Sequence, residues 1–257
     1  MSIQMAQHIA GEHPITDIDL DLLNERFETE SAESVITWAI DTFGNGLVMT
    51  SSFGAQAAVM LHLAYSMLPR LPVILIDTGY LFPETYRFIQ ELTDKLDLNL
   101  KVYTPRITTG WLEAIHGQLW NQGRPGLDEY HRIVKIEPLQ RALKKLNATA
   151  WLAGLRRSQT NFRATLRYVQ RHNSIYKIHP VLNWSNQDIH HYLKLHNLPY
   201  HPLVDQGYAS IGDIHLSQPV RTGQHERQGR FKGMKQECGI HIPQSEAERK
   251  SRDSSGL

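Results

Sequence analysis

The sequence predicts an α/β fold with a doubly wound, mostly parallel sheet, and three observations support this prediction. Short apolar runs of strand length recur before residue 205, and segments with helical periodicity separate them. Some runs are continuously apolar, such as "VILI" at 73–76, which is typical of parallel strands buried on both faces. With 257 residues, of which 41% are hydrophobic, the chain is long enough to bury a large core.

Two helices and a strand–loop–helix unit are expected at the start of the fold. Residues 20–27 and 32–43 carry apolar residues at three- and four-residue spacing, and Gly44 then breaks the pattern. A strand follows within "GLVMTSSFG" (46–54), and its small polar end leads into an apolar helix over 55–68. This order of elements is typical of an α/β fold.

The middle of the chain repeats the alternation. A second strand is expected at 71–79 and a helix over 83–96, with Pro83 in its first turn, where proline is favoured. "LNLKVYTP" (98–105) predicts a third strand. A helix over 137–146 then precedes the fourth strand.

The fourth and fifth strands are expected at 148–155 and 176–182. A last helix over 185–197 begins at Ser185, a good N-cap residue, and ends just before Leu198-Pro199. After about residue 205 no periodicity remains, and Gly, Gln and basic residues become frequent. The C-terminal segment is therefore predicted to be irregular.

The chain is expected to fold as one domain with four parts. Residues 1–43 form an N-terminal helical segment, and residues 44–204 form the nucleotide-binding α/β domain. Residues 205–242 form a catalytic C-terminal segment that carries the only cysteine, Cys238. Residues 243–257 are polar and are expected to be a disordered tail.

Composition excludes several classes of protein. A net charge of +1 argues against general binding of nucleic acid or membranes, and no apolar run approaches the length of a membrane span. The start of the sequence has no signal-peptide pattern, so the chain is expected to be soluble and cytoplasmic. One cysteine cannot form an intramolecular disulfide or a four-thiolate metal or iron–sulfur site.

The loop after the first strand contains small polar residues at the start of a helix. Ser51, Ser52, Gly54 and Gln56 lie in this loop, and backbone N–H groups at a helix N-terminus bind phosphate well. The loop lacks the lysine of a Walker A motif. From this loop alone, an ordinary β–α turn is an equal alternative to phosphate binding.

Two further strands end in polar residues. Asp77, Thr78 and Gly79 follow the second strand and suit a ribose or a base, although the same tripeptide also forms plain turns. Arg156 and Arg157 follow the fourth strand, and the planar guanidinium fork suits phosphate or sulfate oxygens. Since ligands bind at the carboxyl ends of such strands, anion binding is favoured here over a merely solvated basic face.

The cysteine lies among cations near the end of the chain. Arg227, Arg230 and Lys232 precede Cys238, and nearby cations favour a thiolate, the reactive form of the side chain. Glu237 argues against a packed apolar setting for this cysteine. A disordered basic tail is the alternative, but thiol and cations together indicate a nucleophile directed at an anionic substrate.

His241 is a second candidate catalytic residue, since it can donate a proton to a leaving group or support the thiolate. Metal binding is not favoured. His190 and His191 point to different faces of their predicted helix, and no metal-binding motif such as HExxH is present.

Six motifs together resemble the phosphoadenylyl-sulfate reductases, the thioredoxin-dependent enzymes of assimilatory sulfate reduction. The resemblance covers about residues 45–242. The motifs, in chain order, are "TSSFGAQAAV", "IDTGYLFPETYRFI", "KIEPLQRAL", "GLRRSQ", "YHPLVDQGYASIGD" and "KQECGIH". The resemblance implies the adenine-nucleotide α-hydrolase-like fold, in which the first loop is a modified pyrophosphate-binding (PP) loop.

The resemblance also implies a reaction and the residues that carry it out. The reaction is reduction of 3'-phosphoadenylyl sulfate to sulfite and adenosine 3',5'-bisphosphate. Cys238 is implied as the nucleophile that forms an S-sulfocysteine, which thioredoxin or glutaredoxin resolves, with His241 beside it. The implied substrate-binding residues are Ser51, Ser52, Phe53, Gly54, Gln56, Asp77, Thr78, Gly79, Lys135, Arg156, Arg157, Arg227, Arg230 and Lys232.

No resident cofactor or metal is expected, and a homodimer is implied by the resemblance. Relatives that reduce adenylyl sulfate usually carry an iron–sulfur cluster on four cysteines, which this chain lacks. The phosphorylated nucleotide is therefore the favoured substrate. The alternatives are an adenylyl-sulfate reductase, an ATP pyrophosphatase or adenylyltransferase of the same fold, and a non-catalytic nucleotide-binding redox regulator.

Overall fold

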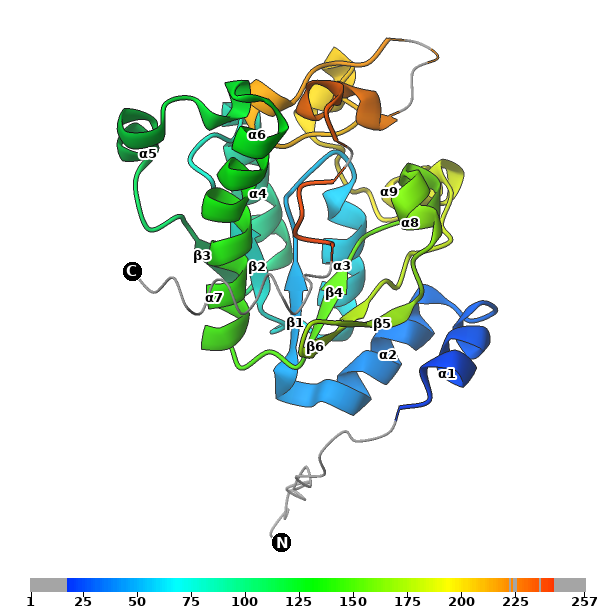
Figure 1. Cartoon of the computed structure of the whole chain (residues 1–257). Coiled ribbons are helices and arrows are strands. Elements are labelled where there is room, and N and C mark those ends of the chain that lie inside the picture. The colour runs from blue at the N-terminus through cyan, green and yellow to red at the C-terminus, as the bar shows by residue number, and fades with distance from the viewer. Residues whose placement is uncertain (1–17, 222, 224–225, 236, 243–257) are drawn as a thin grey trace, which may run out of the picture.

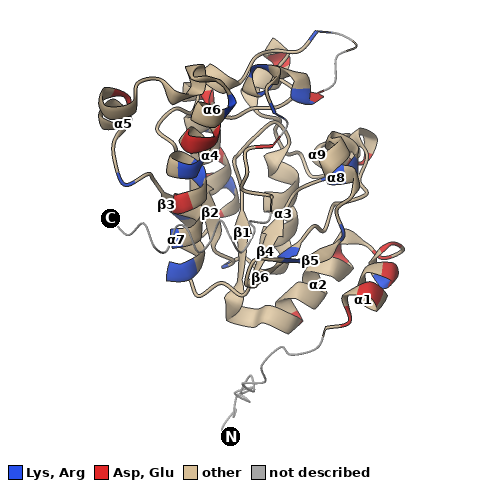
Figure 2. Cartoon of the chain, viewed as in Figure 1, with Lys and Arg blue, Asp and Glu red and all other residues tan. Residues whose placement is uncertain are grey.

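The computed structural model describes residues 18–221, 223, 226–235 and 237–242. The first 17 residues of the predicted helical segment and the whole of the predicted disordered tail (243–257) lie outside the described residues. Within the described part of the chain, no helix is long and apolar enough to cross a membrane. Basic and acidic residues are interleaved over the helices (Figure 2).

Six strands form one sheet in the order β3-β2-β1-β4-β6-β5 (Figure 1). All neighbouring pairs are parallel except β5–β6, which is an antiparallel hairpin. The strands are β1 (Leu47–Thr50), β2 (Val73–Ile76), β3 (Leu100–Tyr103), β4 (Ala150–Ala153), β5 (Val169–His172) and β6 (Ile175–Ile178). The predicted mostly parallel α/β fold is confirmed.

Helices cover both faces of the sheet. The α-helices are α1 (Leu20–Phe27), α2 (Ala32–Phe43), α3 (Ala57–Met67), α4 (Pro83–Leu96), α5 (Thr109–His116), α6 (Gly123–His131), α7 (Glu137–Lys145), α8 (Asn161–Ala164) and α9 (Asn186–Leu195). Helix α3 packs against α2, α4 and α9, whereas α7 packs against β2 and β3. The chain reverses its direction across the sheet between β3 and β4. Right-handed crossovers therefore place α7 on the face opposite α3 and α4.

The predicted helix ends are explained by local hydrogen bonds. Ser185 accepts a hydrogen bond from the backbone N–H of Asp188, and the Asp188 carboxylate accepts one from the N–H of Ser185. This reciprocal pair is a capping box, so the predicted N-cap is confirmed. Pro83 occupies the first turn of α4, as expected.

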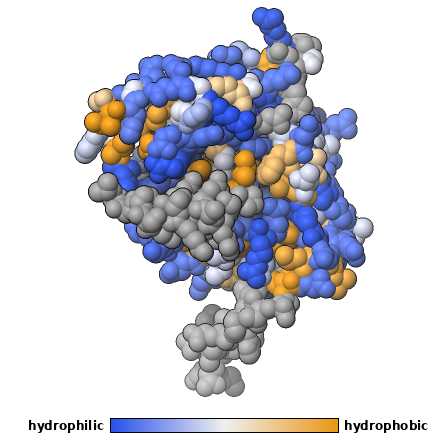
Figure 3. Space-filling model, in the orientation of Figure 1, coloured by the Kyte–Doolittle hydropathy of each residue, from blue (hydrophilic) through white to orange (hydrophobic). Residues whose placement is uncertain are grey.

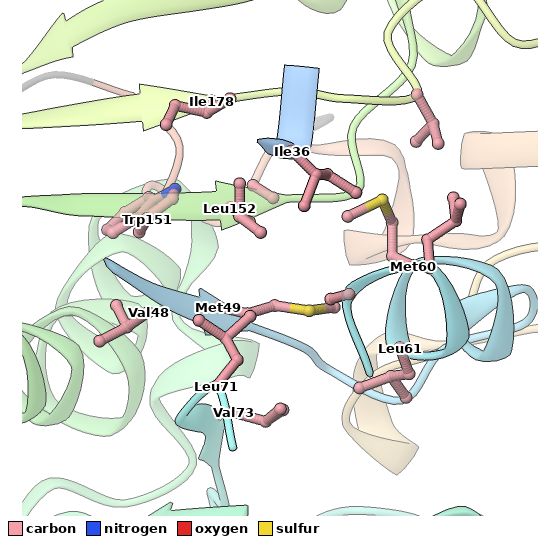
Figure 4. Packing of buried hydrophobic residues seen from close by; sticks show 14 of the residues in the cluster. Ile36, Val48, Met49, Met60, Leu61, Leu71, Val73, Trp151, Leu152 and Ile178 are labelled. Atoms are coloured by element: carbon pink, nitrogen blue, oxygen red, sulfur yellow. The ribbon is translucent and has the colours of Figure 1, made fainter. Parts of the chain in front are cut away.

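The core lies on both sides of the central strands. Trp151 and Leu152 of β4 and Val48 and Met49 of β1 are almost fully buried, and side chains of α2 and α3 pack against this layer (Figure 4). Burying one such side chain contributes about 1.5–3 kcal/mol. Figure 3 shows that one outer face is mainly hydrophilic, with apolar residues in small groups. The core therefore fixes the carboxyl ends of β1 and β4.

The structure contains elements that the sequence patterns did not predict. Strand β5 has the sequence "VQRH", which is short and polar. Because it lies at the edge of the sheet, it lacks the continuous apolar pattern of a buried strand. Strand β6 ends at Ile178, earlier than the expected end at residue 182. Between β3 and α7, helices α5 and α6 and a π-helical turn (Arg132–Ile136) surround a second, smaller apolar cluster.

Candidate active site

A cavity of about 260 Å³ lies at the carboxyl ends of β1 and β4. These two strands are the point at which the sheet order reverses, since β2 and β3 lie to one side of β1 and β4 to the other. Doubly wound sheets bind ligands at this position. The C-terminal segment, orange to red in Figure 1, runs past the carboxyl end of β1, and several of its residues line the cavity.

Ten of the predicted site residues line this cavity. They are Ser51, Ser52, Gly54, Gln56, Lys135, Arg156, Arg227, Arg230, Cys238 and His241. They come from positions up to 190 residues apart in the sequence, which the fold brings together around one space. The cavity thus combines the β1 loop, four of the predicted cations and the single thiol.

The loop after β1 is held in an uncommon conformation at Phe53. Its φ of 48° is in the left-handed region, where bulky residues are rare, and its N–H donates a hydrogen bond to Ser51 Oγ at 3.1 Å. The Phe53 side chain is fully buried in the main core. Phe53 therefore anchors the loop, while its small neighbours face the cavity.

Arg156 presents its charge to the cavity without direct neutralisation by a carboxylate. Its Nη2 donates to Gln56 Oε1 at 2.8 Å, and its Nη1 donates to the Trp184 carbonyl oxygen at 3.3 Å. Both acceptors are neutral. Burial lowers the pKa of the Arg156 guanidinium, which means that the positive charge is poorly solvated. An anion in the cavity would stabilise this charge.

A buried acid–base cluster supports the opposite wall. Asp213 is 0% exposed, accepts a hydrogen bond from Thr78 Oγ1 at 2.8 Å and pairs with Lys135 Nζ at 2.8 Å. Burial alone would raise the pKa of Asp213, but Lys135 and Thr78 hold it at about 2. Asp213 is therefore ionised and fixes Lys135 at the cavity edge.

Arg230 is held by main-chain oxygens. Its Nη1 donates to the Ile211 carbonyl oxygen at 2.8 Å, and its Nε donates to the Leu216 carbonyl oxygen at 3.3 Å. Gly212 makes this position possible, since an added Cβ there would come within 2.7 Å of Arg230 Cζ. Both Arg227 and Arg230 have a pKa lowered by burial, to about 10 in Arg227, where Arg163 and Arg230 lower it further.

The setting of Cys238 differs from the expectation. Glu237 is only 5% exposed and is packed into the protein, because Arg163 pairs with it through Nε–Oε1 at 2.8 Å and Nη2–Oε2 at 2.9 Å. Cys238 packs against the smaller apolar cluster next to α6. The expectation that Glu237 excludes a packed setting was wrong, since a buried arginine neutralises this carboxylate.

His241 reaches from the same segment into the cavity. Its Nδ1 lies 2.7 Å from the Nζ of Lys177, a fully buried lysine on β6. Burial and then the charge of Lys177 keep the pKa of His241 well below its usual value, so its imidazole is neutral. Gly239, between Cys238 and His241, has a φ of 91°, which only glycine adopts without strain.

Six predicted residues do not line the cavity. Phe53 is in the core, and Thr78 acts through Asp213. Arg157 instead pairs with Glu28 at 2.7 Å, and Lys232 Nζ donates to Asn121 Oδ1 at 2.6 Å. The remaining two are Asp77, which accepts hydrogen bonds from Gly79 N–H and Tyr86 Oη–H, and Gly79 itself, which is exposed.

Sequence reasoning missed several residues of the site. Arg163 and Gln159 line the cavity, and Asp213 and Lys177 lie directly behind it. Asp213 ends one of the six motifs, so its position there was an available signal. Lys177 gave a signal too, because a lysine within an otherwise apolar strand pattern is unusual. Within the described residues, no group of three or more His, Cys, Asp or Glu side chains is arranged to hold a metal.

The sequence of this chain is similar to those of a known protein family. A family model described as the phosphoadenosine phosphosulfate reductase domain matches residues 46–219. This chain belongs to that family. The phosphoadenosine 5'-phosphosulfate reductase of Synechocystis sp. is 51% identical to it over 247 residues, which cover 95% of this chain and 99% of the relative. That of Xylella fastidiosa is 51% identical over 87% of this chain and 94% of its own length.

Solved structures give the same assignment to the phosphoadenosine phosphosulfate reductase family. The phosphoadenylyl-sulfate reductase of Candida auris, in a phosphate complex, matches with a TM-score of 0.69 and 32% identity, over 82% of this chain and all of that one. An FMN adenylyltransferase of Candida glabrata matches with a TM-score of 0.57 at 14% identity, over 94% of this chain and 86% of that one. The second likeness shows the shared fold alone.

Proposed function

We propose that this chain reduces 3'-phosphoadenylyl sulfate to sulfite and adenosine 3',5'-bisphosphate. The observation that carries the proposal is the placement of the only cysteine, Cys238, in the same cavity as Lys135, Arg156 and Arg230. The substrate carries roughly four negative charges, and attack by a thiolate on such an anion requires cations to offset the repulsion. Membership of the family supports the same reaction.

The proposed chemistry has two transfers at sulfur. The Cys238 thiolate attacks the sulfur atom of the sulfo group, an S–S bond forms, and the S–O bond to the 5'-phosphate breaks. Adenosine 3',5'-bisphosphate leaves with that electron pair, which Arg156 and the β1 loop stabilise. A thiolate of a thioredoxin or glutaredoxin then attacks the Cys238 sulfur, a mixed disulfide forms, and sulfite leaves with the electron pair of the broken S–S bond. The second thiol of the dithiol protein attacks this mixed disulfide, which restores the Cys238 thiol and leaves the partner as an intramolecular disulfide.

The proposed reaction also has implications for the reductant, the location and the oligomeric state of the enzyme. The electrons come from the external dithiol protein, so no resident cofactor is proposed. We also propose a cytoplasmic location, where dithiol proteins of this kind are kept reduced, and a homodimer, which the family resemblance suggests. Adenylyl sulfate is the alternative substrate. Initial rates with both nucleotides and one reduced thioredoxin distinguish the two substrates.

Mass spectrometry tests the central step. The protein is incubated with 3'-phosphoadenylyl sulfate and no reductant, and it is expected to gain the mass of one sulfo group on the peptide that contains Cys238. Release of that group by reduced thioredoxin should follow. A protein that consumes the nucleotide with no adduct on this peptide would contradict the proposal, and an adduct formed equally from adenylyl sulfate would favour the alternative substrate.

Gly212→Ala should weaken nucleotide binding. The new Cβ overlaps the guanidinium of Arg230, which is held closely between Ile211 and Leu216 and has to move. Loss of one charge-assisted hydrogen bond predicts a decrease in the binding free energy of adenosine 3',5'-bisphosphate of about 1–3 kcal/mol, measured by calorimetry. Gly110→Ala is the matched control, because nothing lies within 4 Å of its added Cβ. Equal affinities of the two variants would exclude this role for Arg230.

A further inference from the structure

A fully buried lysine lies beneath the catalytic segment. Lys177 is on β6, is 0% exposed, and its Nζ lies 5.0 Å from the centre of the Trp151 ring. Its close polar partner is His241 Nδ1, at 2.7 Å. It forms no ion pair with any carboxylate in the described part of the chain. Burying an ammonium group without a carboxylate partner costs free energy, which favours a functional reason for keeping the lysine at this position.

Several charged and titratable groups face Lys177. Burial, and then the charge of Arg163 on α8, lower the pKa of Lys177 to about 7, whereas Cys238 and Glu237 of the C-terminal segment oppose this shift. His179 beyond β6 and His172 on β5 lie near the same pair. The pKa of His179 is lowered to about 3, first by burial and then by Lys177. With the imidazoles of His179 and His241 neutral, the ammonium form of Lys177, which predominates below about pH 7, is the hydrogen-bond donor that faces His241 Nδ1.

The hydrogen bond determines the form of the imidazole. A protonated lysine has no acceptor, so its partner Nδ1 must carry the lone pair, and in a neutral imidazole the hydrogen is then on Nε2. The ring of His241 lines the cavity together with Cys238. Lys177 itself does not line the cavity, so any effect it has on the reaction passes through His241.

We propose that Lys177 is a positioning residue that holds His241 as the Nε2–H form, so that His241 donates a hydrogen bond to an oxygen of the sulfo group as it transfers to Cys238. No proton changes place in this step. The inference rests on the proposed function, since it assigns the sulfo group as the acceptor. It adds a charged residue of the sheet to the groups that support the site.

The first test measures whether Lys177 lowers the stability of the fold. A lysine kept for function should do so, whereas a lysine kept for structure should not. The folded-state pKa of about 7 is below the usual 10.5, so the unfolded chain binds more protons between these pH values. The free energy of unfolding therefore rises with pH across this window, and below it the full cost of burying the charge applies. Lys177→Met is expected to raise the melting temperature by about 4 °C or more at pH 7, and by less at pH 9.5. Lys145→Met, an exposed lysine of α7, should change neither.

The second test measures the reaction and the tautomer. Removal of an oxyanion donor costs about 10²–10³ in kcat, and loss of its positioning should cost less, about 10- to 100-fold in kcat with KM little changed. In His241→Gln, the further change Lys177→Met should have no additional effect on kcat. The ¹⁵N spectra of His241 should show the Nε2–H form in the parent and a mixture in Lys177→Met.

Three results would overturn the proposal: an unchanged kcat, an unchanged tautomer, or kinetic losses that are additive with His241→Gln. If Lys177→Met does not fold, Lys177→Arg replaces it. Arginine always donates, so the Nε2–H form and at least about a tenth of kcat should be retained, and loss of both would equally overturn the proposal. The spectra and melting curves need no turnover. A failure of the proposed reaction, seen as no sulfo adduct on the parent enzyme, is therefore distinguishable from a failure of this inference.

Discussion

Cys238→Ser is expected to abolish sulfite release while leaving nucleotide binding almost intact. The thiol is the only one in the chain, and it lines the cavity among Arg227, Arg230 and His241. A serine hydroxyl at this position is not ionised and is a far poorer nucleophile. Loss of the nucleophile of a covalent mechanism predicts a fall in kcat on the order of 10⁴-fold or more. Coupled assays of sulfite with reduced thioredoxin measure this fall.

The binding measurement gives this prediction its specificity. The affinity for adenosine 3',5'-bisphosphate should change by less than about 0.5 kcal/mol, because the cations that bind it are unaltered. A redox regulator without catalysis would show no turnover in either protein. Turnover of the serine variant at the parent rate would remove Cys238 from the mechanism.

Asp213→Ala should cause the largest loss of stability in the site. The carboxylate is fully buried, and the substitution removes the partner of Lys135 and the acceptor of the Thr78 hydroxyl. Breaking a buried pair by removing one partner costs about 3–5 kcal/mol, because the other charge remains uncompensated. Urea denaturation at pH 7 measures the free energy of unfolding.

Asp205→Ala is the control for this change. Asp205 lies in the same segment but is exposed, so its removal should alter the free energy of unfolding by less than about 0.5 kcal/mol. The parent should also lose stability in acid. The pKa of Asp213 is about 2 in the fold and 3.8 in the unfolded chain, so its contribution is complete above the second value and is lost as the pH falls towards the first. Equal stabilities of the two variants would show that the Asp213 pair contributes little.

The sequence predicted those elements that have a strong period. The apolar run of β2 and the amphipathic α4 lie where their patterns placed them. The β5 strand was missed because an edge strand needs few apolar residues. It is held in the sheet by antiparallel pairing with the neighbouring β6, which the composition of β5 alone does not reveal. Local patterns thus predicted the central strands and the β3 edge of the sheet, but not the polar β5 edge.

The site was predictable where a residue follows a strand or belongs to a motif, as for Arg156 and Cys238. It was not predictable where function depends on a distant partner. Arg163 and Glu237 are 74 residues apart, and only the fold shows that each neutralises the other. Arg157, next to Arg156, pairs with Glu28 instead, since adjacent side chains of an extended strand end point in different directions.

Burial and two neighbouring guanidinium groups lower the pKa of Arg227. Like charges confined in a small space repel one another, so a bound polyanion would lower this repulsion. Occupancy and heat resistance are then coupled. A ligand present at a hundred times its dissociation constant adds about 2.7 kcal/mol to the stability of the fold. The melting temperature of this protein is therefore expected to rise with the concentration of free nucleotide.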